Sequence, residues 1–275
     1  MIEKFKYINH LGEALEFGKG SLFANENDLR DYDWSVVSSG DKISSFKKKK
    51  ASKSIPAIIK APTAEKGIEL RNKIFEIAEK DILANKAGKI VIGDYYLKCF
   101  ITGISKAEYL INKQYAAVDL NIQTDSFGWI KETKFLYRMS KAGDGEEHLD
   151  FSYDTPFDYK SSLAIRELNN DNFTASNFRI VIYGAVVNPL IRIGNHEYSV
   201  KAEVGTNEYL TIDSVEKSIY LTKNDGEKVN CFNNRNKDVY IFEKIPQGVS
   251  IVASENEGLK FDITLLEERS EPKWT

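Results

Sequence analysis

The sequence predicts two domains: a β-rich α+β domain with one helix at residues 1–138, and an all-β sandwich at residues 177–275. Three observations predict this division. The 275 residues exceed what one small core requires and suit two domains. One stretch carries apolar residues at helical spacing, whereas many other runs alternate between apolar and polar residues. In the second half, turn residues separate these runs about every ten positions, which is typical of a β-sandwich.

Short strands are expected before the helix, at residues 5–7, 15–17, 21–23, 34–46 and 54–60. The helix is expected near residues 63–85, because apolar residues there recur on one helical face, at Leu70, Ile74, Ile77, Ala78 and Ile82. Thr63 suits the N-cap, and Lys86 with Gly88 suits the end. We expect this apolar face to pack against a sheet.

Longer strands follow the helix, at residues 89–92 and 95–104, separated by a turn at 93–94, and then at 115–124 and 129–137. Residues 139–176 contain two polar turn clusters and are expected to connect the domains. From residue 177 onward, alternating runs at 178–182, 209–213 and 259–265 are separated by turns. The second domain is therefore predicted to be all-β.

Charge and hydropathy argue against two function classes. A formal net charge of −3 gives no reason to expect sequence-specific binding of nucleic acid. The basic run of Lys47, Lys48, Lys49 and Lys50 lacks interleaved aromatic residues and is interpreted as a solvated loop. No apolar stretch approaches the ~20 residues that cross a bilayer, and the first residues lack a secretion-signal pattern. We expect folding in a cytoplasm, without membrane insertion.

The search for catalytic or metal-binding patterns finds none. Cys99 and Cys231 lie far apart in strand-like runs, where buried, unreactive thiols are expected. The histidines, at positions 10, 148 and 196, lack the spacing of a zinc or triad site. Adjacent carboxylates such as Glu267 and Glu268 would point to opposite faces of a strand. We therefore expect no enzyme, no metal and no cofactor.

Tyrosines in the second domain leave one alternative open. A sandwich can bind a saccharide by stacking an aromatic ring beneath it, and five tyrosines are available: Tyr183, Tyr198, Tyr209, Tyr220 and Tyr240. Tyrosine is also an ordinary strand residue. A carbohydrate-binding module that recognises a host surface is therefore the alternative to a purely structural role.

The order of short motifs resembles the distal tail protein (Dit) family of siphovirus-type phages that infect Gram-positive hosts. In the first half the resemblance covers residues 5–9, 22–23, 55–58, 71–72 and 88–100. In the second half it covers residues 177–184, 188–191, 210–213, 225–226, 245–248 and 267–274. Segment 139–176 departs from the family pattern, and no inserted carbohydrate-binding module is evident.

This resemblance implies a structural protein of the virion tail tip. The first domain would be split-barrel-like and would form a hexameric ring between the tail-tube protein and the tip, or tail-associated, protein. The second domain would be galectin-like and project outward. Lys47, Lys48, Lys49 and Lys50 would be candidates for contacts with neighbouring subunits or the tube. The source would be a phage or a phage-derived tail, assembled in the host cytoplasm.

Overall fold

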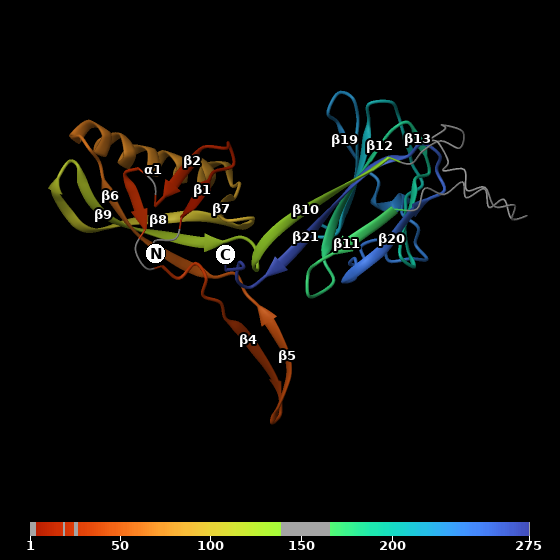
Figure 1. Cartoon of the computed structure of the whole chain (residues 1–275), viewed down its shortest axis with the longest axis horizontal. Coiled ribbons are helices and arrows are strands. Elements are labelled where there is room, and N and C mark those ends of the chain that lie inside the picture. The colour runs from red at the N-terminus through yellow and green to blue at the C-terminus, as the bar shows by residue number, and fades with distance from the viewer. Residues whose placement is uncertain (1–3, 19, 25–26, 139–165, 275) are drawn as a thin grey trace, which may run out of the picture. The chain divides into compact units, whose positions relative to one another are not determined.

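The structure is a computed structural model that describes residues 4–18, 20–24, 27–138 and 166–274. It divides into two compact units, each treated separately below (Figure 1). Unit 1 comprises Met1–Lys131 and Glu268–Thr275, and unit 2 comprises Glu132–Glu267. Residues 139–165 of the expected connecting segment lie outside the described residues, so the expected boundary at residue 138 stays a prediction.

The end of the chain belongs to unit 1, although the sequence places residues 268–275 in the second domain. Contacts with Arg30 give the physical reason. The Arg30 guanidinium donates a hydrogen bond from Nη1 to the Pro272 carbonyl oxygen (2.8 Å). It also lies 3.8 Å from the centre of the Trp274 ring, at the distance of a cation–π contact. No alternation pattern could have revealed these contacts, because they join residues 242 and 244 positions apart.

Unit 1 is built on one antiparallel sheet that curls so that its two edge strands approach each other. Its strands, in sheet order, are β2 (Ala14–Phe17), β1 (Phe5–Ile8), β7 (Gly88–Ile92), β8 (Tyr95–Asn112), β9 (Tyr115–Thr124), β6 (Ser52–Lys60) and β3 (Leu22–Ala24). Strand β10 (Trp129–Arg138) also pairs with the start of β8. The edge strands β2 and β3 are consecutive in the chain, and the Gly18 N–H donates to the Leu22 carbonyl (2.9 Å).

Alternation along the strands explains which side of the sheet forms the core. In β9 the four apolar residues at even positions, Ala116, Val118, Leu120 and Ile122, are buried. Their polar neighbours point the other way, because successive side chains of a strand alternate between the two faces. The predicted strand at 115–124 is therefore confirmed.

Helix α1 (Ala64–Ala84) packs on this sheet and confirms the predicted helix and its N-cap. The Thr63 hydroxyl accepts a hydrogen bond from the Lys66 N–H (3.3 Å). Ile74 and Ile77 are buried as expected. Ile82, however, is 45% exposed, so its assignment to the packed face was wrong. Asp81 takes the inward position instead and is fully buried.

Strands β4 (Trp34–Ser39) and β5 (Lys42–Lys48) form a separate two-stranded hairpin, here called the arm. Figure 1 shows the arm leaving the curled sheet on the side opposite to α1. Lys47 and Lys48 belong to β5, so the expectation that the whole lysine run is a loop was wrong for these two residues.

Unit 2 has two sheets that enclose a common core. One sheet has the order β19 (Lys228–Asn230), β18 (Ser218–Thr222), β17 (Tyr209–Asp213), β12 (Asn177–Tyr183), β21 (Lys260–Arg269), β10. The other has the order β11 (Arg166–Asn170), β20 (Gly248–Ser254), β14 (Leu190–Ile193), β15 (His196–Ser199). The predicted strands of the second half are confirmed, and β11 adds one that the sequence placed in the connecting segment.

A short sheet and one helical turn complete unit 2: β13 (Val186–Val187) pairs with β16 (Glu203–Val204), and η1 is Phe232–Asn234. Apolar side chains of the two larger sheets meet between them. Ile180 and Ile182 of β12 lie in the same buried cluster as Ile191 of β14 and Val252 of β20. Two sheets packed face to face over one core make a β-sandwich.

Candidate assembly surface

The arm has one apolar face. Val36 pairs with Phe46, and Trp34 lies two residues before Val36, so these three side chains point to the same side. In a regular hairpin Ile43, three residues from Phe46, would point to the other side. A β-bulge adds one residue to β5, so that Ile43 pairs with Ser38 and shares the face of Val36. The bulge thus gathers all four apolar side chains on one side of the arm.

This apolar face is open to solvent. Trp34, Val36, Ile43 and Phe46 are 40%, 53%, 58% and 58% exposed. An isolated two-stranded hairpin is marginally stable in water, because it has no third layer to bury its side chains. A contiguous exposed apolar patch commonly marks an interaction site. The arm therefore has the properties of a surface that another protein surface covers.

Lysines fix the base of the arm to unit 1. Three members of the lysine run pair with acids from different parts of the chain: Lys48 with Glu268 (3.2 Å), Lys49 with Asp33 (3.3 Å) and Lys50 with Asp125 (2.7 Å). Lys49 and Lys50 are exposed and lie outside the strands, as predicted, but they also form ion pairs that the sequence did not reveal. Each exposed pair contributes less than about 1 kcal/mol, but together they restrict how the arm leaves the sheet.

A fourth lysine holds the segment that leads into the arm. The Lys53 ammonium donates hydrogen bonds to the carbonyl oxygens of Asp28 (2.6 Å) and Asp31 (2.7 Å). The Asp28 carboxylate accepts a hydrogen bond from the Ser54 N–H (2.9 Å). Burial lowers the pKa of Lys53, and the charges of Asp28 and Asp31 act in the opposite direction. These contacts attach the chain before β4 to the start of β6.

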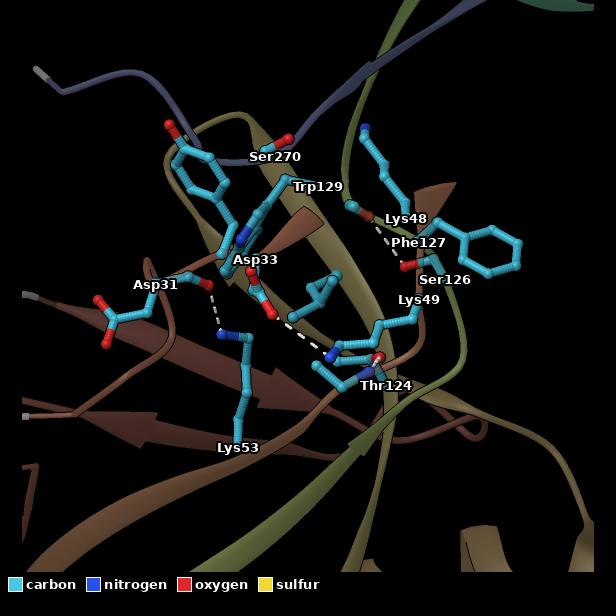
Figure 2. A pocket seen from close by; sticks show the side chains of 14 residues that line it. Asp31, Asp33, Lys48, Lys49, Lys53, Thr124, Ser126, Phe127, Trp129 and Ser270 are labelled. Carbon is cyan, nitrogen blue, oxygen red and sulfur yellow. Dashed lines mark hydrogen bonds and ion pairs between the residues drawn. The ribbon is translucent and has the colours of Figure 1, made fainter. Parts of the chain in front are cut away.

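A hollow of about 490 Å³, partly open to solvent, lies at this base (Figure 2). Figure 2 shows Lys53 directed at Asp31 and Lys49 directed at Asp33 across it. Its wall also includes Trp129 and Ser270. Its lysines are engaged by acids and carbonyl oxygens, so the hollow presents no free cluster of one charge. We interpret it as the joint between arm and sheet.

The sequence missed a buried polar network elsewhere in unit 1. The Asp81 carboxylate of α1 accepts hydrogen bonds from the Tyr7 hydroxyl and from the His10 N–H (2.9 Å). The His10 Nδ1 lies 2.5 Å from Asp81 Oδ1. Burial, and then the hydrogen bond to Asp81, raise the pKa of Tyr7, so its hydroxyl stays protonated and donates. The network links α1 to β1 and to the turn after it.

The histidines and cysteines that remain as candidate catalytic or metal-binding residues do not form a common site in the described part of the chain. The His196 Nε2 lies 3.0 Å from the Tyr240 carbonyl oxygen, and His148 lies outside the described residues. Both cysteines are buried as expected, and burial raises the pKa of Cys99. In the described part of the chain, no three His, Cys, Asp or Glu side chains come together as a metal site. No helix in that part is both long and apolar enough to cross a membrane.

Three of the five tyrosines of the second domain lie on the outer face of the larger sheet of unit 2. Tyr183, Tyr209 and Tyr220 are each 37% exposed, and Tyr183 pairs directly with Tyr209 in adjacent strands. The Tyr183 hydroxyl donates to Asp262 (2.6 Å), which raises the pKa of Tyr183 to about 12. Lys134 pairs with the same carboxylate oxygen (2.8 Å). By contrast, Tyr198 is buried in the core.

Similarity to known proteins comes from structure alone. No protein-family model and no curated protein sequence matches the chain. A chain of the phage P2 baseplate in its activated conformation with calcium matches with a TM-score of 0.63 and 12% identity, over 99% of this chain and 100% of that one. The SPP1 Dit protein, described as a hub adsorption apparatus of phages that infect Gram-positive bacteria, matches with a TM-score of 0.59 and 9% identity. That match covers 96% of this chain and 99% of SPP1 Dit.

The chain has a Dit-type fold. Because the likeness extends over nearly the whole of both chains, it includes unit 1 as well as the sandwich. It agrees with the β-rich, Dit-like fold that the motif order led us to expect.

Proposed function

We propose that the chain is a structural distal tail protein of a phage or a phage-derived tail, and that it forms a hexameric ring between the tail tube and the tip protein. The full-length Dit-type fold and the order of short motifs support this role. In this proposal unit 1 forms the ring, and the galectin-like sandwich of unit 2 contacts the surrounding tail-tip components. The protein acts through shape and contacts in the virion, after folding in the host cytoplasm, and catalyses no reaction.

The apolar face of the arm is the observation that carries the proposal. Covering an exposed Val, Ile or Phe side chain completely contributes about 1.5–3 kcal/mol, and the four side chains of this face are about half covered already. A neighbour that covers the rest would therefore contribute several kcal/mol per contact. In a closed ring every copy gives its arm to one neighbour and receives an arm from the other, so no arm stays uncovered.

Two adjacent valines test this role of the arm. Val36 lies on the apolar face, whereas Val37 lies on the opposite face of the same strand. We expect Val36→Ser to raise the concentration at which rings dissociate by about tenfold or more, since this corresponds to about 1.4 kcal/mol per contact. Val37→Ser is the matched control and should leave assembly unchanged. Light scattering across a dilution series measures both, and equal effects of the two variants would contradict the proposal.

A second candidate function is saccharide binding by the outer face of unit 2. The neighbouring rings of Tyr183 and Tyr209 offer apolar faces for stacking, and the Lys134 side chain, 56% exposed, offers a charged hydrogen-bond donor beside them. This arrangement favours a host-surface saccharide as the ligand.

A glycan array with the full-length protein tests the saccharide candidate. We expect Tyr209→Ala to abolish a signal that Tyr240→Ala retains, because Tyr240 is 56% exposed but lies in the loop after η1, outside the sheet that carries Tyr209. No binding by the unmodified protein, or equal loss in both variants, would leave only the structural role.

A further inference from the structure

Helix α1 carries a second apolar stripe that the described residues of unit 1 leave exposed. Ile68, Phe75 and Ile82 are spaced by seven residues and are 40%, 57% and 45% exposed. Leu83, beside them, is 80% exposed. Seven residues make nearly two full turns, so these side chains form a line along the helix. This line, here called the stripe, is distinct from the packed face that contains Ile74 and Ile77.

Such a stripe is unusual for a helix that already packs on a sheet. Single exposed apolar residues are ordinary on protein surfaces. A surface helix normally has one apolar stripe, which faces its own core, and polar residues on the other faces. Here three large apolar side chains at regular spacing, with Leu83 beside them, face solvent, which indicates a second packing partner.

We propose that, in the assembled ring, the apolar face of the arm docks on the stripe of α1 in the neighbouring copy. This inference rests on the proposed function, because it identifies the surface that receives the arm. Figure 1 shows the arm and α1 on opposite sides of the curled sheet of unit 1, so an arm does not lie on its own stripe. The partner assigned to the arm is therefore α1 of another copy.

Each surface presents four large apolar side chains. From Ile68 to Leu83 the helix rises about 22 Å, at 1.5 Å per residue. The apolar face of the arm is shorter: it runs from Trp34 to Ser38, which pairs with Ile43, and so extends about 13 Å at 3.3–3.4 Å per residue. The helix is therefore long enough to cover the whole apolar face of the arm.

Three glutamates lie beside the stripe. Helical geometry of 100° per residue places Glu65, Glu76 and Glu79 along one side of the stripe. Among the described residues, none forms an ion pair with Glu76 or Glu79. The arm exposes Lys42 and Lys47 on its polar face, where they would attract these glutamates over a distance rather than by contact.

Closed rings also need two different surfaces on every copy. Contacts around a ring are head-to-tail, so the surface that a subunit gives differs from the one that it receives. In this proposal the arm is the surface that each subunit contributes to one neighbour. In the part of unit 1 that the structure describes, the stripe is the extended row of exposed large apolar side chains outside the arm.

Disulfide cross-linking of the full-length protein tests this contact. A chain with Val36→Cys and Phe75→Cys should form a ladder of covalent oligomers on oxidation, up to the size of the closed ring. The native cysteines, Cys99 and Cys231, are buried and should not contribute. The matched control carries Val37→Cys with Phe75→Cys, which places the arm cysteine on the opposite face. We expect at least tenfold less covalent oligomer in that control.

Each outcome of this experiment decides between the two proposals. Rings seen by electron microscopy without cross-linking between positions 36 and 75 would overturn the docking inference and leave the ring intact. Equal cross-linking in the control would also overturn it. Absence of rings in the unmodified protein would overturn the proposed function and this inference together. As a second measurement, Phe75→Ser should reduce the ring fraction at least tenfold, whereas Lys73→Ser on another side of α1 should not.

Discussion

Replacement of Asp81 by alanine should strongly destabilise unit 1. The carboxylate is fully buried in α1 and accepts hydrogen bonds from the Tyr7 hydroxyl and the His10 N–H. Tyr7 is itself only 1% exposed. The alanine variant would therefore leave a buried hydroxyl without its acceptor and separate α1 from β1.

The size of the effect follows from these contacts. A hydrogen bond to a charged group contributes about 1.5–3 kcal/mol, and an abandoned buried polar group costs about 1–3 kcal/mol. Removing one partner of a buried charged pair typically costs about 3–5 kcal/mol. We expect a loss of this size in the free energy of unfolding of unit 1. Tyr7→Phe should cost less, about 1–2 kcal/mol, because the carboxylate keeps its contacts with His10.

Tryptophan fluorescence during urea denaturation measures unit 1 separately. All three tryptophans, Trp34, Trp129 and Trp274, belong to unit 1, and Trp129 is buried in its core. Asp94→Ala, in the exposed turn after β7, is the control and should change the free energy of unfolding by no more than about 0.5 kcal/mol. A loss below about 1 kcal/mol for Asp81→Ala would refute the structural role assigned to this carboxylate.

Two further predictions concern packing and pH. Gly67→Ala should destabilise α1 by about 1–3 kcal/mol in the same assay, because the added Cβ would lie 2.1 Å from the Lys113 carbonyl oxygen. Helix propensity alone predicts the opposite, since alanine favours a helix more than glycine does. Unchanged or higher stability of the variant would therefore contradict this packing. Burial raises the pKa of Tyr137 to about 12, so the folded form of unit 2 holds this proton more tightly than the unfolded form does. The contribution of Tyr137 to the free energy of unfolding should be fully present below pH 10 and should decline as the pH rises towards 12. Tyr137→Phe should weaken this pH dependence when the unfolding of unit 2 is followed by circular dichroism.

The regular parts of the fold could be predicted because their signals are local. Thr63 at the start of an apolar periodic run predicts where α1 begins, and strict alternation predicts β9. Ile82 shows the limit of such patterns. It fits the apolar periodicity, yet Asp81 takes the inward position because Tyr7 and His10, more than seventy positions away, supply its partners.

The candidate assembly surface could be predicted only in part. The alternation of Trp34 and Val36 predicts a strand, but alternation of this kind is also the pattern of a strand that faces a core. Sequence alone does not reveal that these residues stay exposed in unit 1. The pairing of Lys48 was equally hidden, since its partner Glu268 lies 220 positions along the chain. Long-range contacts therefore decide which apolar residues stay exposed and which lysines are engaged.

The proposal that this protein works by assembling into a ring is tested most directly by electron microscopy of the purified full-length chain. Class averages should show closed rings with sixfold symmetry, in which unit 1 lines the ring. A uniform population of single 31.2 kDa particles, unchanged by high protein concentration or by addition of the tail-tube protein, would contradict the account.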